Sequence, residues 1–195
     1  MVRAQTMGDL MSLMILRHAP ALTGGLVTGR REVDADCSDR AALASMAARI
    51  GRPAHVWCSP ARRCLQTAKA LGLSPDRVLP ALLEQDQGLW EGRPLADLPD
   101  LGPLPPEALA HHCPEGGESF LDMAARVRPA LVEAPPGTLI VAHAGTVRAA
   151  LALVVGARAL SFAVTPLSLT ILHRIDPEGT EWAVEAVNLT LPGTA

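Results

Sequence analysis

Short apolar runs alternate along the chain with segments that favour helix. The runs at 12–16, 54–58 and 138–142 are apolar over most of their length, as strands are when helices cover both faces of a sheet. Segments that favour helix follow these runs, at 39–50, from Pro60 to Gly72, at 119–132 and at 146–155. This alternation predicts an α/β fold, a three-layer α/β/α sandwich around a mostly parallel central sheet.

Residues that start or stop helices lie at the expected boundaries. Ser38 is the expected N-cap of the first helix and Gly51 its stop. Ser59 is the expected cap of the second helix, which begins with a proline in its first turn. Gly72 and Gly156 are placed to end the second and the last helix.

The remaining segments complete a single predicted domain over residues 1–195. A brief strand is expected at 77–79, and two late strands at 168–175 and 181–189. The glycine-rich stretch 23–31 indicates a loop. Residues 84–117, rich in proline and glycine, predict an irregular excursion with one short helix.

Composition and charge narrow the classes of function. With 49% apolar residues the chain can form a sizeable core, and its net charge of −3 argues against a nucleic-acid partner. The longest apolar run, 149–155, is too short to cross a membrane, and no leader peptide is evident, so a cytoplasmic location is expected. The sequence leaves the oligomeric state open, with a homodimer among the options.

Four cysteines are too few for a disulfide scaffold, and they show no Cys-x-x-Cys pair. His111, His112 and Cys113 are adjacent, but their spacing is a weak signal for a metal site. The spacing of these residues therefore does not predict a metal site.

Arginine and histidine follow the ends of three predicted strands. The first strand ends in Arg17 and His18, and the fourth ends before His143. The second leads into the Arg62-Arg63 pair. Because ligands bind beyond the carboxyl ends of parallel strands, these side chains should meet at one edge. The N-terminus of the helix into which Ala144 and Gly145 lead should lie there too.

This set of groups suits a phosphoryl group. The guanidinium fork of arginine binds phosphate oxygens in pairs, and helix N–H groups favour an anion. A neutral histidine can attack phosphorus and carry the group as phosphohistidine, provided that the attacking nitrogen is unprotonated. The expected partner is therefore a small-molecule phosphate ester.

Five segments resemble the histidine phosphatase (phosphoglycerate mutase-like) superfamily, in the family's order. LRHAP carries an Arg-His signature, and CSPARRCLQTA resembles the segment Ser-Pro-x-x-Arg-Ala-x-x-Thr-Ala. LLEQDQGLWEG resembles the block Glu-x-x-x-Gly-x-Trp-Glu-Gly, and PEGGES and VAHAGTVRA match the last two motifs. Any one of these matches alone would be weak, but together they span nearly the whole chain.

The resemblance implies a role for each matched position. Arg17 and Arg63 would bind the phosphate, and His18 would be the nucleophile. His143 would stabilise the transferring phosphoryl group, and Glu84 would donate a proton to the leaving oxygen. The resemblance also implies a reaction that needs no metal and no cofactor. By chemistry alone Asp86 and Glu91 are rivals of Glu84, and only the motif register prefers it.

The sequence departs from the family's pattern at three positions. Alanine replaces the usual glycine after each catalytic histidine, at Ala19 and Ala144, which is expected to tighten or shift the pocket. Cys64 stands where the family has alanine. A cysteine phosphatase with Cys58 as nucleophile is disfavoured, because Arg63 follows Cys58 after four residues, where that chemistry needs five.

Several reactions are compatible with these residues. Hydrolysis of a phosphomonoester is favoured over a phosphoglycerate mutase, because the chain has no tyrosine and lacks the asparagine that mutases carry after the first motif. A phosphohistidine protein phosphatase is an alternative, although such phosphatases are shorter and lack a clear Trp-Glu-Gly block. A binding module without turnover is disfavoured, because the set Arg17, His18, Arg63, Glu84 and His143 is complete. Residues 17–39 resemble alpha-ribazole phosphatases of cobalamin biosynthesis, and Arg30 is a candidate contact for the leaving group.

Overall fold

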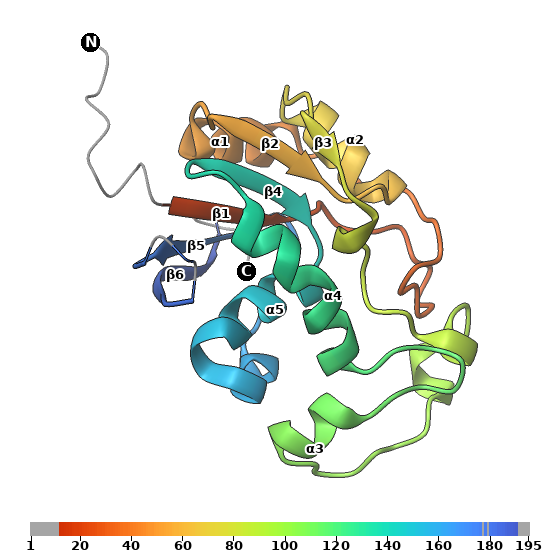
Figure 1. Ribbon diagram of the computed structural model, residues 1–195. Coiled ribbons are helices and arrows are strands. Elements are labelled where there is room, and N and C mark those ends of the chain that lie inside the picture. Colours follow the sequence, from red (N-terminus) through yellow and green to blue (C-terminus); the bar gives the residue numbers. More distant parts are fainter. Residues whose placement is uncertain (1–11, 177, 179, 191–195) are drawn as a thin grey trace.

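The computed structural model describes residues 12–176, 178 and 180–190, which form one central sheet with helices on both faces (Figure 1). The strand order in the sheet is β3-β2-β4-β1-β5-β6. The strands are β1 Ser12–Arg17, β2 His55–Cys58, β3 Arg77–Val78, β4 Thr138–Ala142, β5 Leu169–Arg174 and β6 Trp182–Leu189. The segment before residue 12, on which the prediction about a leader peptide partly rests, lies outside the described residues.

The sheet is parallel on one side and antiparallel on the other. The neighbours β3, β2, β4 and β1 pair in parallel, whereas β5 is antiparallel to both β1 and β6. The predicted α/β fold with a mostly parallel sheet is confirmed. The late strands run antiparallel because only a short connection separates them, and a parallel pair would need a crossover.

Helices cover the sheet on both faces. The helices are α1 Arg40–Ile50, α2 Arg62–Ala70, α3 Pro106–His111, α4 Phe120–Glu133 and α5 Ala144–Val155. One face packs residues of α1 and α2 around Leu139 and Val141 of β4. The other face packs α4 and α5 around Ile140 and Ala142 of the same strand. Alternate residues of β4 therefore serve two separate cores, which explains its continuous apolar sequence.

Two of the predicted helix caps are wrong. The N-cap of α1 is Asp39, whose carboxylate accepts a hydrogen bond from the Ala42 amide, and not Ser38. The N-cap of α2 is Ala61, with no side-chain hydrogen bond, because the hydroxyl of Ser59 is bound to a histidine described below. Helix α5 begins at Ala144, two residues earlier than predicted, and ends at Gly156 as expected.

The excursion at 84–117 is irregular, as predicted. It contains short 3₁₀ turns at Gly88–Trp90 and Leu95–Asp97 and the single α-helix α3. Gly88 and Gly117 let two parts of this segment approach closely, since a Cβ on Gly88 would overlap the carbonyl oxygen of Glu115. The Gly88 backbone also has a left-handed φ of 51°. This contact holds the segment in place although little regular structure supports it.

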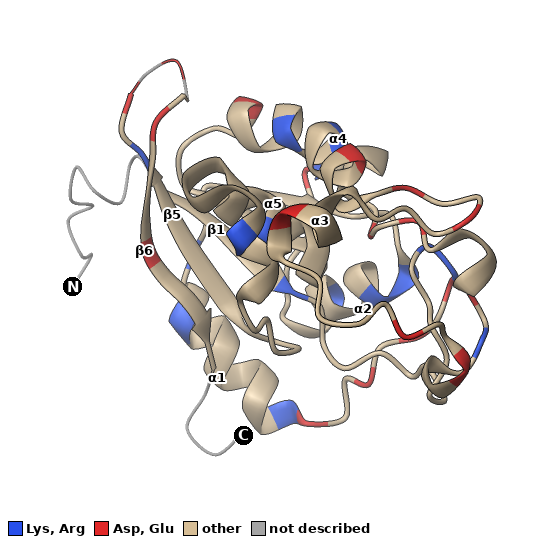
Figure 2. Cartoon of the chain, turned by 90° about the horizontal axis from the view of Figure 1, so that it is seen from below, with Lys and Arg blue, Asp and Glu red and all other residues tan. Residues whose placement is uncertain are grey.

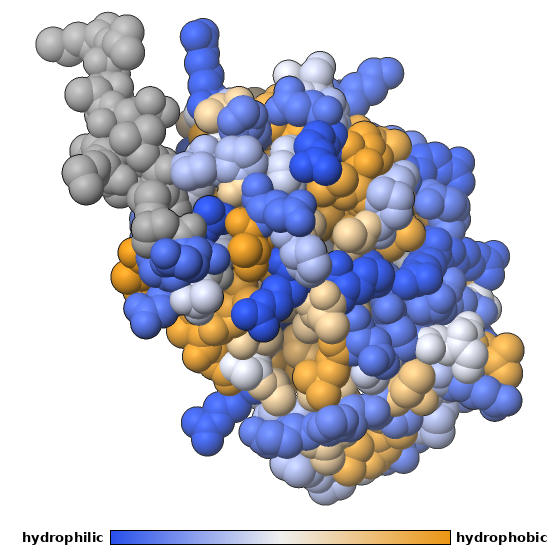
Figure 3. All heavy atoms as spheres, viewed as in Figure 1, coloured by the Kyte–Doolittle hydropathy of each residue, from blue (hydrophilic) through white to orange (hydrophobic). Residues whose placement is uncertain are grey.

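Charged residues of both signs are spread over the loops. Figure 2 shows acidic and basic positions interspersed around α2 and along the excursion. Apolar side chains also reach the surface, and the orange area at the lower end of Figure 3 lies where Figure 1 shows α3. Leu104 and Leu109 are exposed in that region.

One stretch has the length and apolar composition of a membrane span. It covers Ala144–Ser161, which is α5 with the 3₁₀ turn Gly156–Ser161 that follows it. Its sequence is more apolar than the short run 149–155 suggested. One side of α5, which includes Val147, Ala150 and Leu151, packs in the core of the domain, whereas Val154 and Val155 near its end are exposed.

Replacement of Gly88, which is in close contact with other backbone, should lower the free energy of unfolding more than replacement of Gly102, which has open space around it. Gly102 also has a left-handed φ, of 66°, but its Cβ would meet nothing within 4 Å. We expect Gly102→Ala to lower the free energy of unfolding by about 1 to 2 kcal/mol, and Gly88→Ala by roughly 2 to 5 kcal/mol because overlap is added to backbone strain. Urea denaturation measures both values, and equal losses would contradict the close contact.

Candidate active site

The predicted arginines and histidines converge at the carboxyl end of the parallel strands. Arg17 ends β1, His18 follows it, and His143 follows the neighbouring strand β4. The rings of His18 and His143 lie 5.2 Å apart between centroids, in an edge-to-face arrangement. Arg63 enters from the first turn of α2 and reaches His143. The three strand ends therefore meet, as the sequence predicted.

His18 is buried and neutral, with one ring nitrogen fixed. Its Nδ1 lies 2.6 Å from the carbonyl oxygen of Ala19, so Nδ1 carries the proton and Nε2 keeps its lone pair. Burial lowers the pKa of His18 to about 3, and the positive charges of Arg63 and Arg17 add to the shift. The hydrogen bond to Ala19 acts in the opposite direction. An unprotonated nitrogen is thus available over a wide pH range.

His143 has the opposite tautomer. Its Nδ1 accepts a hydrogen bond of 3.3 Å from the Arg63 guanidinium, which has only donors. Its Nε2 therefore carries the proton and donates to the hydroxyl oxygen of Ser59 at 2.8 Å. The ring is fully buried, and burial followed by the charge of Arg63 lowers the pKa of His143 well below its ordinary value. The sequence predicted the histidine but not the hydroxyl that orients it.

Two backbone carbonyl groups hold the Arg63 guanidinium. Its Nη2 donates to the carbonyl oxygen of Gly29 at 2.7 Å and its Nη1 to that of Arg31 at 3.1 Å. Only 2% of the residue's surface is exposed. The loop that follows the first motif thus fixes an arginine of the second motif without neutralising its charge.

Arg17 is held in a similar way, by the carbonyl oxygen of Val164. Burial lowers the pKa of its guanidinium, which nonetheless stays cationic, and the carboxylate of Glu84 opposes that shift. Its Nε is buried and has no hydrogen-bond partner among the described residues. This group is therefore placed to bind an anion between β1 and the start of α5.

Glu84 lies at the N-terminal turn of α5. Its Oε2 accepts a hydrogen bond of 3.4 Å from the amide of Gly145, and a Cβ at that glycine would overlap the other carboxylate oxygen. The two rivals are engaged elsewhere in the excursion. Asp86 binds the amide of Gly88 and the Arg30 side chain, and Glu91 accepts from the amide of Arg30. The geometry therefore favours Glu84 as the proton donor, as the motif register does.

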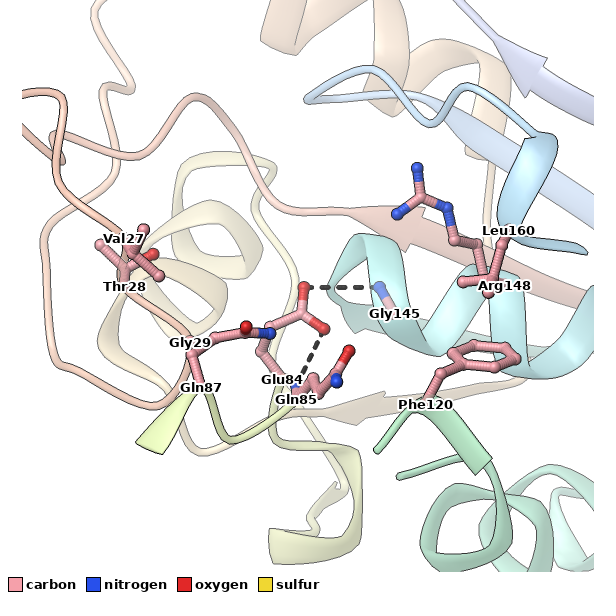
Figure 4. Close-up of a pocket in the computed structure, with 10 residues that line it drawn as sticks. All are labelled: Val27, Thr28, Gly29, Glu84, Gln85, Gln87, Phe120, Gly145, Arg148 and Leu160. Atoms are coloured by element: carbon pink, nitrogen blue, oxygen red, sulfur yellow. Dashed lines mark hydrogen bonds between the residues drawn. The ribbon is translucent and has the colours of Figure 1, made fainter. Parts of the chain in front are cut away.

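A cleft of about 240 Å³ opens beside Glu84 (Figure 4). Val27 and Thr28 lie at one end of it in this view, whereas Phe120, Arg148 and Leu160 lie at the other, with Glu84 between them. These five lining residues were not predicted from the sequence. Arg148 is the first arginine after β4, and its position one turn along α5 was a usable signal.

A partly buried ion pair supports the backbone next to Glu84. Arg126 of α4 donates to the carbonyl oxygens of Ala81 at 2.8 Å and Leu83 at 3.1 Å, and it forms an ion pair with Glu118. It also donates to the carbonyl oxygen of Glu84 itself, at 3.3 Å. Helix α4 thus fixes where the carboxyl-bearing loop runs.

Arg30, the predicted contact for the leaving group, has other partners, and the tryptophan of the LLEQDQGLWEG motif does not line the cleft. Arg30 forms ion pairs with Asp86 and Glu118 and is not among the side chains that line the cleft. Trp90 stacks on His112, with ring centroids 5.3 Å apart, outside the cleft. Among the described residues no cluster of three His, Cys, Asp or Glu side chains could hold a metal ion.

The departures from the motifs fit the backbone. Neither Ala19 nor Ala144 has a positive φ, so the missing glycines cause no backbone strain. Cys64 packs against His143, with its sulfur 3.5 Å from Nε2. Cys58 is buried, and burial raises the pKa of its thiol to about 12, so it is unsuited to act as a nucleophile.

The sequence profile of the histidine phosphatase superfamily (branch 1) matches residues 13–190. The chain belongs to the histidine phosphatase superfamily. No curated protein sequence matches it significantly. Solved structures resemble it over most of its length, which confirms the fold.

Two proteins illustrate these structural likenesses. Mycobacterial glucosyl-3-phosphoglycerate phosphatase is 25% identical, with a TM-score of 0.77 over 92% of this chain and 99% of its own. The same enzyme in complex with inorganic phosphate is 27% identical, with a TM-score of 0.77 over 92% and 98%. TTHB049 of Thermus thermophilus is 26% identical, with a TM-score of 0.69 over 83% and 92%. These likenesses support phosphoryl hydrolase activity, but they do not show the predicted alpha-ribazole branch.

Burial of a neutral histidine predicts a pH dependence of stability. His18 titrates near pH 3 in the folded state and near pH 6.5 when unfolded, so stability is lost as the pH falls through this interval. We expect His18→Gln to reduce the slope of unfolding free energy against pH by up to about one proton between pH 6 and 4. Chemical denaturation across this range measures the slope.

His55→Gln at an exposed position of β2 is the matched control, and it should leave the slope close to that of the wild-type protein. An unchanged slope in the His18 variant would show that this histidine is not buried in the neutral form.

Proposed function

We propose that this protein hydrolyses a small phosphate monoester through a phosphohistidine formed on His18. The observation that carries the proposal is the His18 imidazole, whose Nε2 lone pair lies in a buried site with two arginines and a second histidine. Membership of the histidine phosphatase superfamily supports the same reaction class.

In the first step the ester phosphate binds between Arg17, Arg63 and the N-terminus of α5. Nε2 of His18 attacks phosphorus, and the bond to the leaving oxygen breaks as the new P–N bond forms. Once the His143 ring turns from Ser59, its Nε2–H can donate a hydrogen bond to a phosphoryl oxygen. This hydrogen bond would stabilise the negative charge that develops on that oxygen.

Glu84 serves as proton donor to the departing alcohol. It lies between the phosphate-binding groups and the cleft, where the leaving oxygen would be. The dianionic phosphate favours its protonated form through like-charge repulsion. In the second step the same carboxylate takes a proton from water, which attacks phosphorus, releases inorganic phosphate and restores the neutral His18.

Three candidate substrates follow from the likenesses. Glucosyl-3-phosphoglycerate is the substrate named for the mycobacterial phosphatase. Alpha-ribazole phosphate rests on the resemblance of residues 17–39 alone, and protein phosphohistidine on the superfamily. A mutase reaction on phosphoglycerates is the competing outcome, in which the phosphoryl group returns to substrate and no phosphate is released.

Removal of the nucleophile should abolish turnover. We expect His18→Ala to lower phosphate release by at least about 10³-fold on a panel of the candidate esters, measured without added metal. Rapid quenching of the wild-type protein with a labelled ester should trap an acid-labile phosphoryl group that the variant lacks. Cys58→Ser is the control and should retain activity. An active His18→Ala variant together with an inactive Cys58→Ser variant would reverse the assignment of the nucleophile.

The effect of removing the proton donor on kcat should depend on the leaving group of the substrate. We expect Glu84→Gln to lower kcat for an alkyl phosphate by roughly 10² to 10⁴, and to affect p-nitrophenyl phosphate much less because that phenolate leaves without a proton. Arg126→Gln, which loosens the backbone at Glu84, should show the same leaving-group dependence to a smaller extent.

Arg128→Gln on the exposed face of α4 is the matched control for Arg126→Gln. Equal losses on both substrates in the Glu84 variant would assign Glu84 a role other than proton donation.

A further inference from the structure

The cleft beside Glu84 has two chemically different ends. One end is lined by the arginine Arg148 and by the apolar residues Phe120 and Leu160, and the Arg148 guanidinium points away from the Phe120 ring. Towards the other end lie the neutral polar side chains of Thr28 and Gln87. Because Glu84, the proposed proton donor to the leaving oxygen, lines this space, the cleft is where the part of the substrate beyond the ester oxygen would lie. Its lining therefore indicates the chemistry of that part.

Arg148 differs from the arginines around the excursion in having no carboxylate partner. Arg30 and Arg126 both form ion pairs with Glu118. Arg148 instead donates through Nε and Nη2 to a single carbonyl oxygen, that of Phe162, at 3.3 and 3.1 Å. Among the described residues it forms no ion pair, and its Nη1 has no hydrogen-bond partner. The guanidinium is thus oriented but keeps its full charge.

The local charge balance leaves room for a second anion. Arg148 lies close enough to Arg17 for its positive charge to lower the pKa of that guanidinium, with burial as the larger cause. Glu84 is the only carboxylate that lines the cleft among the described residues, and in the proposed reaction it is protonated when substrate is bound. A phosphate compensates the charges of Arg17 and Arg63, so the charge of Arg148 remains uncompensated.

We infer that Arg148 binds a carboxylate carried by the leaving group, and that this makes carboxylated alcohols the preferred leaving groups of the proposed phosphatase. The inference rests on the proposed function. A planar carboxylate suits the guanidinium fork, and Phe120 and Leu160 at the same end of the cleft suit the carbon skeleton that joins it to the ester oxygen. The polar end near Thr28 and Gln87 leaves space for hydroxyl groups on a larger substituent.

A matched pair of esters tests the inference. In 3-phosphoglycerate a carboxylate takes the place of one hydroxymethyl group of glycerol 3-phosphate, and the remaining atoms are the same. We expect the wild-type protein to have a kcat/KM for 3-phosphoglycerate roughly 10- to 100-fold above that for glycerol 3-phosphate, as one charge-assisted pair in a desolvated site allows. Equal values would overturn the inference.

Variants of Arg148 assign the preference to this residue. Arg148→Gln should lower kcat/KM for 3-phosphoglycerate by about the whole preference and change the value for glycerol 3-phosphate less than about threefold. Arg148→Lys, which keeps the charge, should retain part of the preference. Arg158→Gln on the exposed part of the following 3₁₀ turn is the control and should change neither value. Equal losses on both esters would show a structural role only.

A binding measurement separates this inference from the proposed function. In a His18→Ala background, calorimetry gives the dissociation constants of both esters without turnover. Tighter binding of 3-phosphoglycerate that disappears on adding Arg148→Gln supports the carboxylate site even if no ester is hydrolysed. Equal dissociation constants for the two esters, together with phosphate release by the wild-type protein, would support the phosphatase activity and reject the carboxylate site.

Discussion

Neutral carbonyl oxygens orient the guanidinium groups of the active-site arginines. The rest of the site depends on the fact that these hydrogen-bond partners are carbonyl groups and not carboxylates. Arg17 donates to Val164, Arg63 to Gly29 and Arg31, and Arg148 to Phe162. A carboxylate in any of these places would compete with the substrate, since two opposite charges at 4 Å attract by about 4 kcal/mol at an effective dielectric constant of 20. Carbonyl groups fix the geometry and leave the attraction for an incoming anion.

Burial, reinforced by the same uncompensated charge, keeps both histidines neutral. Burial disfavours an imidazolium, and the neighbouring guanidinium of Arg63 disfavours it further for His18 and His143 alike. Their hydrogen bonds then select opposite tautomers, with the lone pair on Nε2 of His18 and the proton on Nε2 of His143. One ring can therefore attack phosphorus while the other donates a hydrogen bond, although the two residue types are identical.

The sequence was sufficient for the strands and for the groups at their ends, because apolar runs and the residues that follow them are local signals. It could not show that Ser59 binds His143, because a serine that precedes a proline and a helix is equally compatible with a role as helix N-cap. The preference for Asp39 over Ser38 as N-cap was likewise beyond a pattern that accepts either residue. For Glu84 against Asp86 the sequence offered only the motif register, because the contacts that distinguish the two carboxyl groups come from distant parts of the chain.

The segment that carries Glu84 also lines the cleft, so proton donation and recognition of the leaving group depend on one stretch of irregular backbone. Its position is fixed from outside by Arg126 and Glu118 and from within by the close approach of Gly88 and Gly117. Substitutions at the cleft surface, such as those at Gln87 or Thr28, can therefore change what fits beyond the ester oxygen without moving the carboxyl group. Such a division would allow the loop that faces the leaving group to change while the phosphate-binding groups on the sheet stay in place, because loops tolerate change that strand ends do not.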